Sequence, residues 1–226
     1  LMALIALGAV LALVVVVVLV TGGDDGNGGE NGENGSEVAA AESCEEVERP
    51  APKQVNLEQP QPGTSLEPGE PAAAVVETSC GSFTIELDTA RAPKTAESFA
   101  YLAERGAFDD TFFHRIAPDF VIQGGDPRGD GTGGPGYQIR EAPPTDLTYE
   151  PGTVAMAKTE DEPAGTSGSQ FFVITGAMGA TLTPDYALVG EVTDGMDVVD
   201  TIGALGGPDQ QPTETVVIES VTVEAG

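Results

Sequence analysis

The polar side chains best suited to chemistry lie in the otherwise apolar stretch 112–126. It holds the only histidine of the chain, His114, followed by Arg115, and it ends on Gln123 before two glycines. The stretch has the composition of β-strands, in which alternate side chains share a face. Beyond a turn at 117–119, this alternation places Gln123 on one face with Val121. An arginine and a glutamine beside large apolar groups suit a neutral, apolar ligand that forms hydrogen bonds.

Other kinds of catalytic site find little support in the sequence. Two cysteines and one histidine, widely spaced, do not make a metal site. No Ser–His–acid set is evident. The glycine-rich residues 124–136 lack the Gly-Lys-Ser/Thr ending of a phosphate-binding loop. We therefore expect neither a metal nor a cofactor.

The charge of the chain limits the kinds of molecule that it can bind. The formal net charge is −28, from 37 acidic residues against 9 lysines and arginines. Because such a surface would repel a phosphate backbone, we expect no nucleic-acid binding.

The pattern of residues 1–71 predicts a membrane anchor followed by a linker. Residues 1–20 are almost wholly apolar, and a helix of that length spans roughly 30 Å, the thickness of the hydrocarbon core. We favour an uncleaved anchor over a cleaved signal peptide, because no small-residue cleavage site follows. The next cation is Arg49, which predicts a single-pass protein with its main domain outside the cytoplasm. Residues 21–71, acidic and Gly/Asn-rich, then Pro/Gln-rich, predict a disordered linker.

The two cysteines, Cys44 and Cys80, are candidates for a disulfide if the domain is exported. Such a bridge would tie the far end of the linker to the first strands of the domain. The alternative is a pair of unbonded thiols.

The remaining residues, 72–226, form one domain in this interpretation, and about 155 residues are enough for an ample core. The pattern predicts a β-hairpin over 72–88 and helices that begin at Pro93 and Met196. Short strands are expected at 112–116, 120–123, 153–157, 170–175, 187–192 and 215–223. Many short strands with only two helices indicate a mainly β fold, a closed barrel with helical caps.

Four separated segments resemble the signature of cyclophilin-type peptidyl-prolyl cis-trans isomerases. They are residues 113–126, Gly-Thr-Gly-Gly at 131–134, Met-Ala at 156–157 and Gly-Ser-Gln-Phe-Phe at 168–172. They follow the order and approximate spacing of that family, and the resemblance covers residues 72–226.

The resemblance implies a closed eight-stranded antiparallel barrel capped by two helices. It also implies catalysis of cis-trans isomerisation at X-Pro bonds, without a cofactor. Combined with the apolar N-terminus, it indicates a bacterial membrane-anchored member that acts on exported proteins. Its partners would be proline-containing unfolded or flexible polypeptides, and the chain is expected to be a monomer.

The resemblance further assigns site residues. Catalytic roles fall on Arg115, as stabiliser of the twisted amide, and on His114, Phe120 and Gln123. Substrate-binding roles fall on Val121, Gly131, Ala157, Lys158, Thr159, Gln170, Phe172, Leu182 and Tyr186.

One departure concerns inhibitors, because Thr181 stands where many members carry tryptophan. Tight binding of the family's cyclic peptide inhibitor is therefore not expected. An alternative function is a proline-segment binding module or chaperone in which isomerisation is incidental, and a third is an envelope scaffold with an acidic surface.

Overall fold

The computed structural model describes residues 44–226. The predicted anchor, residues 1–20, and the first part of the predicted linker lie outside the described residues. In the described part, no helix combines the length and apolar character needed to cross a bilayer.

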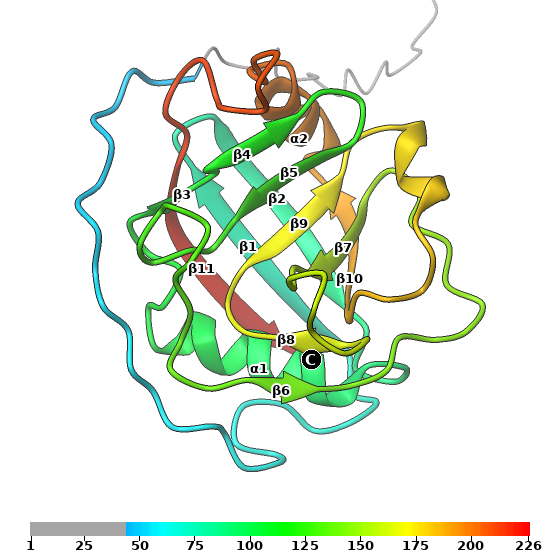
Figure 1. The fold of residues 1–226 in the computed structure, drawn as a ribbon. Coiled ribbons are helices and arrows are strands. Elements are labelled where there is room, and N and C mark those ends of the chain that lie inside the picture. The colour runs from blue at the N-terminus through cyan, green and yellow to red at the C-terminus, as the bar shows by residue number, and fades with distance from the viewer. Residues whose placement is uncertain (1–43) are drawn as a thin grey trace, which may run out of the picture. The chain divides into compact units, whose positions relative to one another are not determined.

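A single antiparallel sheet dominates residues 44–226 (Figure 1). Its nine strands lie in the order β3-β11-β1-β2-β10-β7-β9-β5-β4. Their bounds are β1 Ala72–Thr78, β2 Gly81–Leu87, β3 Thr111–Phe112, β4 Arg115–Ala117, β5 Val121–Gly124, β7 Thr153–Met156, β9 Phe171–Ile174, β10 Leu188–Asp194 and β11 Val217–Ala225. Two short strands, β6 Ile139–Arg140 and β8 Thr166–Ser167, form a separate pair.

The sheet curls into a half-barrel whose outer strands in the hydrogen-bonding order are β3 and β4. These two strands are consecutive in the chain, with only Phe113 and His114 between them. The mainly β prediction is confirmed. The main sheet has nine strands rather than the expected eight, and full closure of the barrel stays a prediction.

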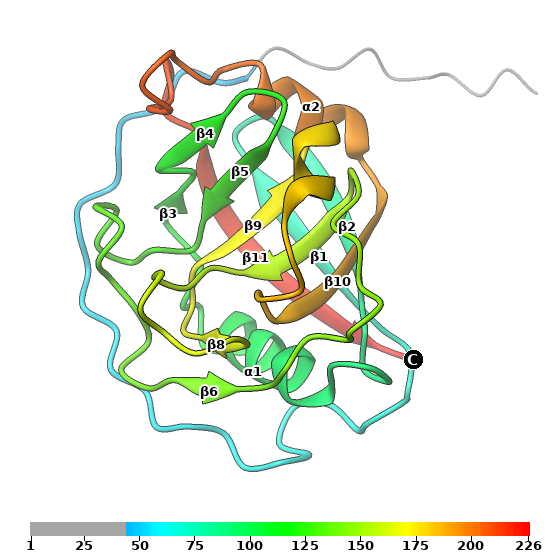
Figure 2. The same ribbon diagram turned by 45° about the vertical axis from the view of Figure 1, so that its right-hand side comes forward.

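Within residues 44–226, two α-helices lie at opposite ends of the sheet (Figures 1 and 2). Helix α1 runs from Pro93 to Glu104 and α2 from Met196 to Gly203. Proline is suited to the first turn of α1, where its missing N–H has no intrahelical partner. A five-residue 3₁₀ helix at Ala177–Thr181 was not predicted.

The core lies inside the curl, and the strand alternation explains its composition. Ile116, Ile122 and Val173 are fully buried and pair across β4, β5 and β9. Phe113 is also buried there, with its ring 6.3 Å from that of Phe171. The strand is interrupted after β3: β3 pairs with β11, whereas β4 pairs with β5. Phe113 and Arg115, two positions apart, would share a face in an unbroken strand, but because of this interruption they do not.

Residues 44–71, called here the N-terminal strap, correct part of the linker prediction. They contain no helix or strand, but they run along one side of the domain, blue to cyan in Figures 1 and 2, instead of extending freely. Every second residue over 53–57 is half-buried, with Val55 and Leu57 packed on the core. The Glu97 carboxylate accepts the backbone N–H groups of residues 64–66, and Leu66 is buried. The domain boundary itself stays a prediction.

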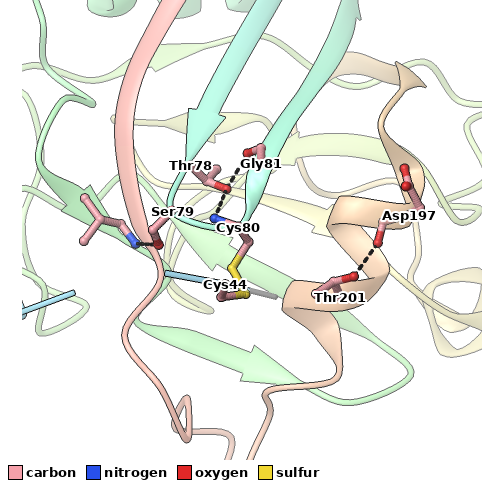
Figure 3. Close-up of a disulfide and its surroundings, with 8 residues drawn as sticks. Cys44, Thr78, Ser79, Cys80, Gly81, Asp197 and Thr201 are labelled. Atoms are coloured by element: carbon pink, nitrogen blue, oxygen red, sulfur yellow. Dashed lines mark hydrogen bonds between the residues drawn. A yellow bond between two sulfur atoms is a disulfide. The ribbon is translucent and has the colours of Figure 1, made fainter. Parts of the chain in front are cut away.

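A disulfide between Cys44 and Cys80 fastens the start of the strap (Figure 3). Cys80 is buried in the turn between β1 and β2, and its N–H donates to Thr78 Oγ1 at 3.1 Å. This turn needs Gly81, whose φ is 108°, in a region that side chains disfavour. The predicted cysteine pair is thus bonded in the structure.

Candidate active site

A cross-strand row builds the site on the outer face of the sheet. Arg115 of β4 lies directly opposite Gln123 of β5, and Gln123 lies opposite Phe172 of β9. Phe172 in turn pairs with Ala155 of β7. Because side chains at directly opposite positions share a face, antiparallel register alone brings the arginine, the amide and the aromatic ring together. Their strands lie side by side in Figure 1.

A chain of hydrogen bonds fixes the guanidinium of Arg115. Its Nε donates to Gln210 Oε1 at 2.8 Å, and its Nη1 donates to Gln123 Oε1 at 3.2 Å. Gln123 Nε2 then donates to Gln170 Oε1 at 3.1 Å. At the end of this hydrogen-bond series, Gln170 Nε2 donates to the backbone oxygens of Gly131, at 3.1 Å, and of residue 133, at 2.9 Å. The arginine is therefore held on two sides.

A small cavity of about 160 Å³ adjoins this arginine. It is lined by Arg115, Phe120, Val121, Gln123, Ala157, Lys158, Phe172, Leu182 and Tyr186. The guanidinium carbon lies 5.8 Å from the centre of the Phe120 ring. The rings of Phe172 and Tyr186 meet edge to face at 5.3 Å. The cavity thus combines an apolar wall with one cationic donor.

A second, larger cavity of about 750 Å³ shares Gln123, Ala157 and Lys158 with the first. Gly131, Thr159 and Gln170, which the sequence also assigned to substrate binding, line this one. The two cavities are therefore adjacent and share part of their walls.

Two charged groups border the site. Burial lowers the pKa of Arg115 from its ordinary value, but a guanidinium stays protonated at any physiological pH. The Lys158 ammonium pairs with Asp185 at 2.6 Å, and this hydrogen bond raises the pKa of the lysine. Lys158 also donates to the backbone oxygens of Thr159 and Glu162. The positive charge of Lys158 is therefore balanced by Asp185, and its ammonium N–H groups already have acceptors within the protein.

His114 is the predicted residue that the structure does not bring into the site. It lines neither cavity, and its ring lies edge to face with Phe112 at 6.4 Å. Its buried Nδ1 has no hydrogen-bond partner in the described part of the chain. Burial lowers its pKa, with Asp126 acting in the opposite direction and Arg115 in the same direction. His114 lies in the break between β3 and β4, and a direct catalytic role for it stays a prediction.

Three residues important to the site were missed from the sequence. Gln210 reaches Arg115 from a turn near the C-terminus, with a positive φ of 62°. Tyr149 is fully buried and its hydroxyl donates to Tyr186 O at 2.8 Å, which holds that side of the cavity. Asp185 neutralises Lys158. Nothing in their local sequence distinguishes them, because their roles depend on contacts with distant segments.

Comparison with known proteins decides the family. Residues 73–223 match the family model described as cyclophilin type peptidyl-prolyl cis-trans isomerase/CLD. The chain belongs to this family. The predicted enzyme class, peptidyl-prolyl cis-trans isomerase, is confirmed.

Relatives of this cyclophilin-type chain match about two thirds of its length. It is 40% identical over 171 residues to a peptidyl-prolyl cis-trans isomerase B of Streptomyces anulatus, with 67% of this chain and 95% of the relative covered. It is 39% identical over 156 residues to a peptidyl-prolyl cis-trans isomerase-like 1 of Aspergillus oryzae, covering 66% and 94%.

A solved cyclophilin-type isomerase of Cryptosporidium parvum is also similar. Its structure was determined in the presence of the dipeptide Ala-Pro, and it is 28% identical to this chain with a TM-score of 0.63. The match covers 68% of this chain and 99% of that one.

Proposed function

We propose that the small cavity binds the proline ring of an X-Pro segment and that Arg115 stabilises the twisted amide. The observation that carries this proposal is the row of Arg115, Gln123 and Phe172 beside the cavity. The Ala-Pro dipeptide present with the similar Cryptosporidium protein supports proline-containing peptides as the substrate class.

The chemistry follows from the amide bond. Resonance gives that bond a rotational barrier of roughly 18–20 kcal/mol, and uncatalysed X-Pro isomerisation takes tens to hundreds of seconds. Rotation breaks the conjugation, so the proline nitrogen becomes pyramidal and regains a lone pair. A fixed guanidinium N–H can donate to this lone pair but gains little from the planar ground state. Such differential binding of the transition state lowers the barrier.

The fixed position of Arg115 supports this mechanism. Two N–H groups of Arg115 are occupied by Gln210 and Gln123, which fix its plane, and the others remain available for substrate. The apolar wall of Phe120 and Phe172 holds the ring while the preceding residue rotates. Because no bond to the enzyme forms, neither a nucleophile nor a cofactor takes part.

The substrates we propose are exported proteins, with the domain held outside the cytoplasm as a monomer by the N-terminal anchor. The Cys44–Cys80 disulfide supports this location, because disulfides persist in oxidising compartments. Protease treatment of intact cells tests it, and a domain that stays protected would contradict the topology.

We also propose weak binding of the family's cyclic peptide inhibitor. Thr181 is exposed at the end of the 3₁₀ helix, next to Leu182 of the small cavity. A tryptophan there would add apolar area and an indole N–H donor. The variant Thr181→Trp should bind the inhibitor more tightly in a titration, and an unchanged Kd would contradict this.

A protease-coupled assay with an X-Pro peptide tests the catalytic role. One preorganised donor contributes about 10²–10³-fold to rate, so Arg115→Ala should lower kcat/KM by that factor while circular dichroism stays unchanged. Arg91→Ala is the matched control, since Arg91 is exposed and pairs with Asp88. An Arg115→Ala variant as active as the wild type would refute the assignment.

A further inference from the structure

The N-terminal strap contacts the outer side of the glycine-rich loop, residues 124–136. Arg49 Nη2 donates to Gly129 O at 2.6 Å, and its guanidinium carbon lies 4.4 Å from the centre of the Phe112 ring. The Lys53 backbone N–H donates to the oxygen of residue 127 at 2.8 Å. The Leu57 N–H donates to the oxygen of residue 135 at 2.7 Å. The strap therefore bonds to the loop near both of its ends and in its middle.

The inner side of the same loop faces the site. The buried Asp126 carboxylate accepts the N–H groups of residues 128, 130 and 131, at 2.6 to 3.1 Å, and so shapes the turn. The backbone oxygens of Gly131 and Gly133 accept the two bonds from Gln170. Gln170 supports Gln123, and Gln123 supports Arg115. The loop thus links the strap to the guanidinium through a continuous set of hydrogen bonds.

Because of its composition, the glycine-rich loop depends on the contact with the strap for its conformation. More than half of residues 124–136 are glycine, so the segment has little intrinsic stiffness. Gly129 has a φ of +69°, and a side chain there would collide with the Phe112 ring. The loop is therefore held by the Phe112 ring, the strap and its own Asp126 rather than by intrinsic backbone stiffness.

We propose that the N-terminal strap is a positioning element for the isomerase reaction, with Arg49 as its main positioning residue. Arg49 holds the glycine-rich loop, and the loop holds Gln170 and with it the orientation of Arg115. This inference rests on the function proposed above, because it takes Arg115 as the catalytic donor.

The test uses the full chain and four variants. Arg49→Ala removes the bond to Gly129 and the stacking on Phe112, whereas Arg49→Lys keeps a cationic donor. Leu57→Pro removes the N–H that bonds to residue 135. Gln54→Ala is the matched control, because Gln54 is an exposed strap residue on the outward parity. Peptide turnover, thermal unfolding and amide hydrogen exchange are measured for each.

We expect kcat and kcat/KM of Arg49→Ala and Leu57→Pro to fall together by about 2- to 30-fold, the range for residues that act through a connected network. A parallel fall in both indicates loss of transition-state stabilisation alone. The amides of residues 128–131 should exchange faster in both variants. The Tm should stay close to that of the wild type in Arg49→Ala and fall in Leu57→Pro, which also loses the contact of Leu57 with the core. Arg49→Lys should recover most of the rate, and Gln54→Ala should behave as the wild type.

Wild-type kcat in both Arg49→Ala and Leu57→Pro would overturn the inference, as would a rate loss without faster exchange in the loop. An equal loss in Gln54→Ala would overturn it as well. These failures are distinct from failure of the proposed function, in which Arg115→Ala would keep the activity of the wild type. If Arg115→Ala is defective and the strap variants are not, only the positioning role falls.

Discussion

Removal of the Cys44–Cys80 disulfide should markedly destabilise the domain. The bridge joins residues 36 apart in the sequence. Closing a loop of that size removes unfolded-chain entropy worth roughly 4 kcal/mol at room temperature. For a domain of this size each kcal/mol moves Tm by roughly 2–4 °C, so the expected loss is roughly 8–16 °C.

The native structure favours a loss of stability close to the whole loop-closure value. The strap between the two cysteines is bonded along its length, to residues 127, 129 and 135 and to Glu97. Since the strap is already ordered in the folded protein, the bridge restricts mainly the unfolded chain. Alanine is the best replacement at the buried Cys80, because a serine hydroxyl would be buried there.

Thermal unfolding of the wild type and of Cys44→Ala/Cys80→Ala, each with and without excess dithiothreitol, provides the assay. The double variant and the reduced wild type should unfold at similar temperatures, and dithiothreitol should not change the Tm of the variant. A loss smaller than about 3 °C, or under 1 kcal/mol, would refute the reasoning from loop closure.

Three further predictions concern single side chains. Tyr149→Phe removes a hydroxyl that donates to Tyr186 O and accepts from Tyr186 N–H. The free energy of unfolding, measured in urea, should fall by about 1–3 kcal/mol, and KM should rise. An unchanged urea midpoint would count against this role. The pKa of His114 is lowered from 6.5 by burial. The unfolded state therefore binds the proton more tightly, and stability should fall as pH drops through 6.5 and below. In His114→Phe this pH-dependent loss should be smaller, and identical profiles for the two proteins would exclude the histidine as its source. Glu97→Gln weakens an acceptor of three backbone N–H groups. It should cost about 1.5–3 kcal/mol and speed amide exchange at residues 64–66, and wild-type exchange there would show that the carboxylate is not needed.

Much of the fold and of the site could be predicted from local patterns. Alternation in β5 predicts that Val121 and Gln123 share a face, and the structure places both beside the small cavity. The hairpin, the proline start of α1 at Pro93 and the start of α2 at Met196 agree with the structure. These features depend on neighbouring residues and on backbone preferences, which a sequence displays directly.

The differences from the predictions have physical causes of two kinds. The family resemblance assigns His114 to the site, but His114 lies in the break between β3 and β4, where its ring packs beside Phe112 and lines neither cavity. The Pro/Gln-rich part of the predicted linker is expected to be extended and separate from the domain because of its proline and glutamine content. Its alternate burial over 53–57 is a weak signal of docking, and the sheet surface that receives it is formed by segments far along the chain.

The family signature, the strand alternation and the residue types of the site can be predicted from the chain because each is a property of short segments. Which distant groups complete the site depends on the folded structure. The bond from Arg115 to Gln210 spans 95 positions, and the bond from Arg49 to Gly129 spans 80. Contacts of that kind depend on strand register and chain path, which arise only when the whole sheet has formed.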